Sequence, residues 1–211
     1  MEPISIFDRF IIIDNFYTDP DAVRNHALSL PKEDVTGGNY SGIMSLDHFL
    51  TPEHLSAFAK VFGHEVSPST QLAGKFRFSQ IGNAATQNIH FDPGLNQVWA
   101  GVWYGSKEHP EVDGTAFWKH KRTGLESIPP TQEGIEQYGW NGVDDLKLFL
   151  ETDGVDYSKW DKTFSVPYKY NRCVFFRPLL FHSPGPEFGT DLESARLVQT
   201  FFFSPNNCNA V

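Results

Sequence analysis

The chain has 211 residues, a length that favours a single domain. Its 17 Lys and Arg are outnumbered by 26 Asp and Glu, so the formal net charge is −9. A surface of that sign repels phosphate backbones and anionic headgroups, which disfavours nucleic acid and membrane surfaces as partners. Two cysteines cannot build a disulfide framework. With no leader pattern and no long apolar run, we expect a soluble, cytoplasmic protein.

Aromatic residues are unusually frequent, with 19 Phe, 7 Tyr and 5 Trp. Such residues favour strands and large, rigid cores, so we expect a β-rich protein. The aromatic excess also allows a homodimer.

The first 71 residues predict mainly helices. A short apolar run at 10–13 indicates a buried strand. Asp-Pro and Thr-Pro pairs each supply an N-cap followed by a first-turn proline, which predicts helices over 20–30 and 52–62. The stretch 32–47 has little periodicity and is predicted to be a loop.

From about residue 72 the pattern becomes that of strands. Alternating or continuous apolar residues predict them at 75–79, 98–104, 115–118, 172–177 and 195–204. The segment 124–163 interrupts this pattern, because it is rich in Gly, Pro and acidic residues, with a short helix expected at 143–150. We therefore predict one domain over 1–211, with helical support at 1–71 and a β core at 72–204 that carries this insertion.

The pair His90 and Asp92 is the first candidate for chemistry. On a strand, residues two apart point to the same face, so both side chains can reach one metal ion. Chance alone produces such a pair in about every second chain of this composition. The pair gains weight from His182, which ends the apolar run 175–182. Two histidines and one carboxylate leave open positions on the metal and suit Fe(II).

Arg196 is the second candidate, because it lies within a predicted apolar strand. A guanidinium there needs an anion, which a cofactor carboxylate would supply. The alternative is a surface ion pair with Asp191 or Glu193.

The order of these residues resembles that of the Fe(II)/2-oxoglutarate-dependent dioxygenases, in particular the prolyl-hydroxylase-like branch and an uncharacterised bacterial subgroup. In that branch the pair is followed by a strand that ends in tyrosine, as Gly101–Tyr104 does here, and by a Gly-Thr-x-Phe strand, matched by Gly114–Phe117. The resemblance covers 72–204 well and the amino-terminal part more loosely.

The resemblance implies a mainly β (α+β) fold, the double-stranded β-helix or jelly roll. It implies Fe(II) bound by His90, Asp92 and His182, and a 2-oxoglutarate co-substrate whose far carboxylate contacts Arg196 and the Tyr104 hydroxyl. The activity implied is hydroxylation of an amino acid, a peptide or protein side chain, or a small metabolite, with consumption of O2 and release of succinate and CO2. Because His182 and Arg196 lie further apart than is usual in the branch, the loop 183–193 is expected to absorb the excess.

Three further residues are candidates for substrate contact. Asn88 lies two before His90 on the same expected strand face, Trp118 follows the Gly-Thr-x-Phe strand, and Trp140 belongs to the insertion, which we expect to form a lid. Each could equally be a packing or turn residue. Two other functions stay open: a non-enzymatic β-helix module that binds a ligand or protein, and a cupin-type metalloenzyme that does not use 2-oxoglutarate.

Overall fold

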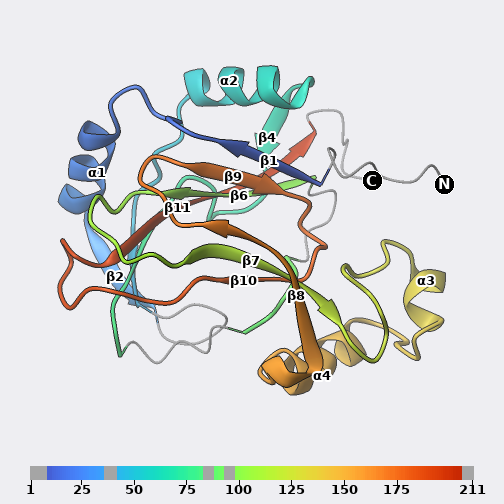
Figure 1. The fold of residues 1–211 in the computed structure, drawn as a ribbon. Coiled ribbons are helices and arrows are strands. Elements are labelled where there is room, and N and C mark those ends of the chain that lie inside the picture. The colour runs from blue at the N-terminus through green and yellow to red at the C-terminus, as the bar shows by residue number, and fades with distance from the viewer. Residues whose placement is uncertain (1–8, 36–41, 83–87, 93–97, 206–211) are drawn as a thin grey trace.

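The computed structural model describes residues 9–35, 42–82, 88–92 and 98–205, and two antiparallel β-sheets form its centre (Figure 1). Seven strands of the larger sheet lie in the order β1 (Phe10–Ile13), β9 (Cys173–Phe176), β6 (Trp99–Tyr104), β11 (Arg196–Pro205), β5 (Phe76–Ser79), β3 (Gly42–Ser45) and β2 (Lys32–Val35). An eighth strand, β4 (Val66–Pro68), pairs with the end of β11. The smaller sheet has the order β10 (His182–Pro184), β7 (Asp113–His120) and β8 (Trp160–Pro167).

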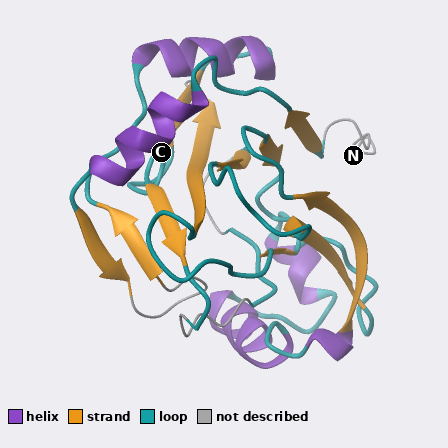
Figure 2. Ribbon diagram, turned by 60° about the vertical axis from the view of Figure 1, so that its left-hand side comes forward, coloured by secondary structure: helices purple, strands orange, loops and turns teal. Residues whose placement is uncertain are grey.

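Helices cover the outer sides of this core, with α1 (Pro20–Ser29) and α2 (Pro52–Phe62) on one side and the helices of the insertion on the other (Figures 1 and 2). Helix α1 (Pro20–Ser29) begins at Asp19, whose side chain accepts a hydrogen bond from the Ala22 N–H. Helix α2 (Pro52–Phe62) ends at Gly63, which adopts a left-handed conformation with φ 76°. The insertion forms α3 (Gln132–Glu136), α4 (Val143–Asp153) and a 3-10 turn, η2 (Tyr157–Lys159).

Because successive side chains on a strand point to opposite faces, the large side chains of the larger sheet form separate clusters on its two faces. Phe76 and Phe78 of β5 point outward and pack with Phe58 of α2 in one cluster. Tyr104 and Phe176 belong to another cluster, which lies between the two sheets and includes Phe117 of the smaller sheet. The inner faces of both sheets are therefore the place where a site can form.

The predicted strand at 10–13, both amino-terminal helices and the two-sheet core are confirmed. The strand at 10–13 is not fully buried, however, because β1 is an edge strand and Ile12 is 43% exposed. The prediction of a loop over 32–47 was wrong at 32–35 and 42–45, where β2 and β3 form. These strands and β4 join the larger sheet, so 1–71 contributes more than helical support.

Strand β8 at the end of the insertion was also missed. Among the described strands it pairs with β7 alone, and five of its eight residues are exposed, so the apolar alternation that marks a strand is weak. None of the helices in the described ranges is long and apolar enough to cross a bilayer.

An ion cluster holds β1 against the start of β9. The Asp14 carboxylate accepts hydrogen bonds from Arg172 Nε (2.6 Å) and Nη2 (3.1 Å) and from Lys169 Nζ (2.7 Å). These hydrogen bonds hold the pKa of Asp14 well below its ordinary value, and the bonds from Arg172 contribute most to this shift. A carboxyl group whose pKa is lowered by folding stabilises the folded state at pH values above its unfolded-state pKa. This contribution is lost as the pH falls toward the folded-state pKa.

We predict that Asp14→Asn lowers the free energy of unfolding at pH 7 by about 0.5–1 kcal/mol, a modest value because the side chain is 37% exposed. The difference from wild type should shrink as the pH falls below about 4, the unfolded-state pKa of aspartate. Urea unfolding at several pH values measures it, with Asp161→Asn as a control at an exposed carboxylate. A difference that does not change with pH would contradict the assignment.

Candidate metal centre

His90, Asp92 and His182 come together in one cluster between the sheets. One ligand atom from each residue lies within 4.8 Å of the others. His90 and His182 form an antiparallel bridge, in which His90 N donates to His182 O (2.9 Å) and His182 N donates to His90 O (2.8 Å). The Asp92 N–H donates to Pro178 O at 2.8 Å. Backbone hydrogen bonds therefore hold the His90–Asp92 segment beside His182, which is far away in the sequence.

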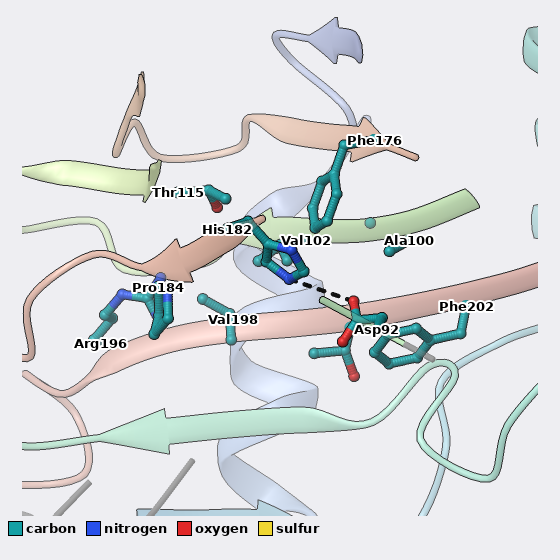
Figure 3. Close-up of a pocket in the computed structure, with 12 residues that line it drawn as sticks. Asp92, Ala100, Val102, Thr115, Phe176, His182, Pro184, Arg196, Val198 and Phe202 are labelled. Atoms are coloured by element: carbon teal, nitrogen blue, oxygen red, sulfur yellow. Dashed lines mark ion pairs between the residues drawn. The ribbon is translucent and has the colours of Figure 1, made fainter. Parts of the chain in front are cut away.

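The side chains of Asp92 and His182 point toward each other (Figure 3), and the His90 ring lies close to both. Asp92 Oδ2 lies 3.4 Å from His182 Nε2, and Asp92 Oδ1 lies 3.8 Å from His90 Nε2. His90 is 1% exposed and His182 2% exposed. Three donor atoms thus face one point that is shielded from solvent.

Both imidazole rings are oriented by a hydrogen bond from Nδ1, the ring nitrogen that points away from Asp92. His90 Nδ1 lies 2.8 Å from Asn88 O, and His182 Nδ1 lies 2.8 Å from Leu180 O. Because a carbonyl oxygen only accepts, each Nδ1 carries the proton in these bonds. Nε2 is left as the nitrogen that faces Asp92, and such outer hydrogen bonds are typical of metal-bound histidines.

Burial also sets the protonation of the cluster. It lowers the pKa of His90 to about 4, with a further contribution from His182, so His90 is neutral at pH 7. Burial by itself would raise the pKa of Asp92, but the neighbouring His182 and His90 outweigh it, and that pKa is lowered. A neutral imidazole and a carboxylate are the forms that bind a metal ion, and the donor set fits Fe(II).

A cavity leads from this cluster to Arg196, with His182 between Asp92 and Arg196 (Figure 3). Arg196 is 4% exposed, and its Nη2 donates to Gly114 O at 2.8 Å. Its guanidinium carbon lies 5.7 Å from the centre of the Tyr168 ring. Its Nε is buried with no hydrogen-bond partner among the described residues, so a donor remains for a ligand.

The alternative of a surface ion pair for Arg196 is not supported. The Asp191 carboxylate accepts instead from Ser194 N (2.8 Å) and Oγ (2.6 Å), which closes a turn in the loop after β10. In the same loop Phe188 packs between the sheets, and its carbonyl accepts from Arg196 N at 3.3 Å. The longer connection is thus folded against the core, and β11 begins with Arg196 beside the cavity.

Tyr104 is not among the residues that line the cavity. Its hydroxyl shares a hydrogen bond with Thr115 Oγ1 at 2.8 Å, and Thr115 is the residue that lines the cavity. A Cβ at Gly114 would lie 2.4 Å from the Tyr104 ring, so the Gly-Thr pair makes room for the tyrosine and presents the threonine. In the sequence Thr115 stands out only as part of the Gly-Thr-x-Phe motif, and nothing there shows which of the two hydroxyls faces inward.

The three candidate substrate residues do not line this cavity. The Asn88 carbonyl orients His90, as described above. Trp118 donates from Nε1 to Ser183 Oγ at 3.0 Å and borders a separate hollow beside β1 and β8. Trp140 is 6% exposed and packs against Phe149 of α4, which makes it a core residue of the insertion.

We predict that Gly114→Ala destabilises the protein by about 1–3 kcal/mol, because the new methyl group would overlap the Tyr104 ring. Gly142→Ala is the control, since no atom lies within 4 Å of a Cβ there. Chemical denaturation compares the two. Equal effects would show that the space at Gly114 is not required.

Comparisons with known proteins agree with the fold. SnoN, a non-heme α-ketoglutarate-dependent epimerase from nogalamycin biosynthesis, superimposes with a TM-score of 0.51 at 10% identity, over 94% of this chain and 79% of SnoN. HygX from Streptomyces hygroscopicus, in a structure with nickel and 2-oxoglutarate bound, gives a TM-score of 0.46 at 10% identity, over 96% of this chain and 85% of HygX. YcfD, a ribosomal oxygenase from Escherichia coli in complex with cobalt and succinic acid, gives 0.36 at 12% identity, over 94% and 49%.

The likeness to SnoN confirms the double-stranded β-helix. No sequence among the curated proteins matches the chain. A family model described as "Family of unknown function (DUF6445)" matches residues 6–203, almost the whole chain. The chain therefore belongs to the DUF6445 family.

Proposed function

We propose that the protein is an Fe(II)- and 2-oxoglutarate-dependent oxygenase. It would hydroxylate an amino acid, a peptide or protein side chain, or a small metabolite, and release succinate and CO2. The observation that carries this proposal is the placement of His90, Asp92 and His182 on the same cavity as a buried arginine. The fold shared with SnoN, an α-ketoglutarate-dependent enzyme, supports it.

The histidine and aspartate side chains are the proposed iron ligands. His90 and His182 would donate through Nε2 and Asp92 through a carboxylate oxygen, with the hydrogen bonds at Nδ1 holding both rings in place. Bound Fe(II) supplies the redox chemistry that couples cleavage of the keto acid to oxidation of the substrate. Three protein ligands leave the remaining positions for small molecules.

Arg196 is the proposed anchor for the far carboxylate of 2-oxoglutarate. Its guanidinium is already oriented by Gly114 O and the Tyr168 ring, so little side-chain entropy is lost on binding. Thr115 offers a hydroxyl on the same wall. Burial raises the pKa of Tyr104, which keeps the phenol protonated and bonded to Thr115, so Tyr104 is a positioning residue in this account.

Apolar side chains form much of the remaining wall. The cavity near the triad is lined by four apolar residues, Ala100, Val102, Phe176 and Phe202. They offer few hydrogen-bonding groups to water, which strengthens electrostatic contacts within the site and limits unproductive oxidation.

Single substitutions of the triad test the metal site directly. We expect His90→Ala, Asp92→Ala or His182→Ala to weaken Mn(II) binding at least about 100-fold, since each removes one of three ligands. Anaerobic calorimetry with Mn(II), a redox-stable substitute for iron, measures the loss. The exposed His64→Ala is the control and should bind like wild type. Wild-type affinity in a folded triad variant would refute the assignment.

Arg196 is tested through 2-oxoglutarate affinity rather than turnover. In the Mn(II)-loaded protein, Arg196→Ala should weaken 2-oxoglutarate binding at least about 30-fold, because a buried charge pair is lost. Thr115→Ala and Tyr104→Phe should weaken it about 2–10-fold, as expected for one neutral hydrogen bond. Arg122→Gln, at a largely exposed arginine, is the control.

Two results would favour the other functions. Wild-type protein that binds Mn(II) but not 2-oxoglutarate would indicate a metalloenzyme that does not use this keto acid, whereas unchanged 2-oxoglutarate affinity in Arg196→Ala would show that Arg196 is not its anchor. Failure of the folded wild-type protein to bind either Mn(II) or 2-oxoglutarate would favour a non-enzymatic binding module.

A further inference from the structure

A second arginine, Arg77 of β5, faces the space between the sheets. Its neighbours Phe76 and Phe78 are 0% and 1% exposed and pack outward in the cluster under α1 and α2. Because successive side chains on a strand alternate between faces, Arg77 points inward. The proposed iron and co-substrate contacts do not use it.

The sheet register places Arg77 beside the cavity. Arg77 lies opposite Val198 of β11 and opposite Met44 of β3. Residues directly opposite on adjacent strands share a face, with Cβ atoms about 5 Å apart. Val198 lines the cavity between Arg196 and Asp92 (Figure 3), and Arg77 is its direct neighbour on the adjacent strand.

The charge of Arg77 reaches the metal end of the site. It contributes to lowering the pKa values of both His90 and Asp92. On β11, Arg196 lies two residues before Val198 and therefore on the same face of the strand, and it is paired with Ser79 of β5. The two arginines are therefore distinct positive charges on neighbouring strands: Arg196 lines the cavity, and Arg77 lies opposite Val198, which also lines it.

In this arrangement Arg77 has no role in binding the keto acid. If Arg196 takes the far carboxylate and the metal takes the near end, the co-substrate does not need Arg77. A guanidinium at a partly desolvated wall presents a planar fork of donors that matches an oxyanion.

We propose that Arg77 binds an oxyanion group, a carboxylate or phosphate, of the organic substrate and so restricts the enzyme to anionic substrates. This inference rests on the proposed oxygenase function. It narrows the substrate class to molecules in which the oxidised carbon lies within a few bonds of a negative charge.

The test uses the protein loaded with Mn(II) and 2-oxoglutarate and three small probes of similar shape. Benzoate and phenylphosphonate carry the two oxyanions, and benzamide is the neutral counterpart. Calorimetric titration should show one of the anions binding at least about 10-fold more tightly than benzamide, a difference of roughly 1.4 kcal/mol. Arg77→Gln should remove that preference, whereas Arg77→Lys should keep part of it.

Lys119→Gln is the matched control, because it removes one positive charge from an exposed position on β7. The affinity for 2-oxoglutarate should stay within about 2-fold of wild type in Arg77→Gln and Arg77→Lys. Thermal unfolding followed by circular dichroism shows whether each variant is folded. If Arg77→Gln does not fold, the comparison of Arg77→Lys with wild type decides.

Several outcomes would overturn the inference. Absence of a preference for either anion in wild type would do so, as would an unchanged preference in folded Arg77→Gln. A loss of 2-oxoglutarate affinity in Arg77→Gln would assign Arg77 to the co-substrate instead. If wild type binds neither Mn(II) nor 2-oxoglutarate, the proposed function fails separately, and the same probes titrated into the metal-free protein still test Arg77.

Discussion

The pair of backbone hydrogen bonds between His90 and His182 is the constraint on which the site depends. It joins the segment before β6 to the first residue of β10 and sets the two imidazole rings 4.4 Å apart between their centres. Asp92 follows from the same segment, held by its own bond to Pro178 O. The metal ligands are therefore positioned by backbone hydrogen bonds, with His182 as part of a strand and His90 in an isolated bridge to it, and this suits a site that must hold a fixed geometry.

The same pairing relates the triad to the two inward arginines. β10 pairs with β7, whose Gly114 carbonyl orients Arg196, while β11 presents Arg196 and Val198 on the facing wall. Burial affects both the metal end of the site and the end at Arg196. It keeps His90 neutral and Tyr104 protonated, and it leaves Nε of Arg196 without a hydrogen-bond acceptor in the part of the chain that the structure describes. A metal ion and anionic ligands are the groups that this environment would accommodate.

Sequence reasoning succeeded where local chemistry decides the structure. The Asp-Pro and Thr-Pro helix starts and the β5 alternation are local signals, and the structure confirms them. It failed for β2, where three of four residues are polar, and for β8, where four of eight are polar, so their pairing is decided by tertiary contacts. The triad could be found because the order of its residues is typical of a known family. Which hydroxyl faces the cavity, Tyr104 or Thr115, and the inward direction of Arg77 depend on the packing of two sheets, which no single segment encodes.

The most direct test of the central account is an anaerobic titration of the apoprotein with Fe(II) and 2-oxoglutarate, followed by visible absorption. A chelate of the keto acid on iron gives a charge-transfer band, and the measurement needs no knowledge of the substrate. The account predicts a band that saturates at one iron and one 2-oxoglutarate per chain in wild type and is absent in His90→Ala. Folded wild-type protein that gives no band would contradict it.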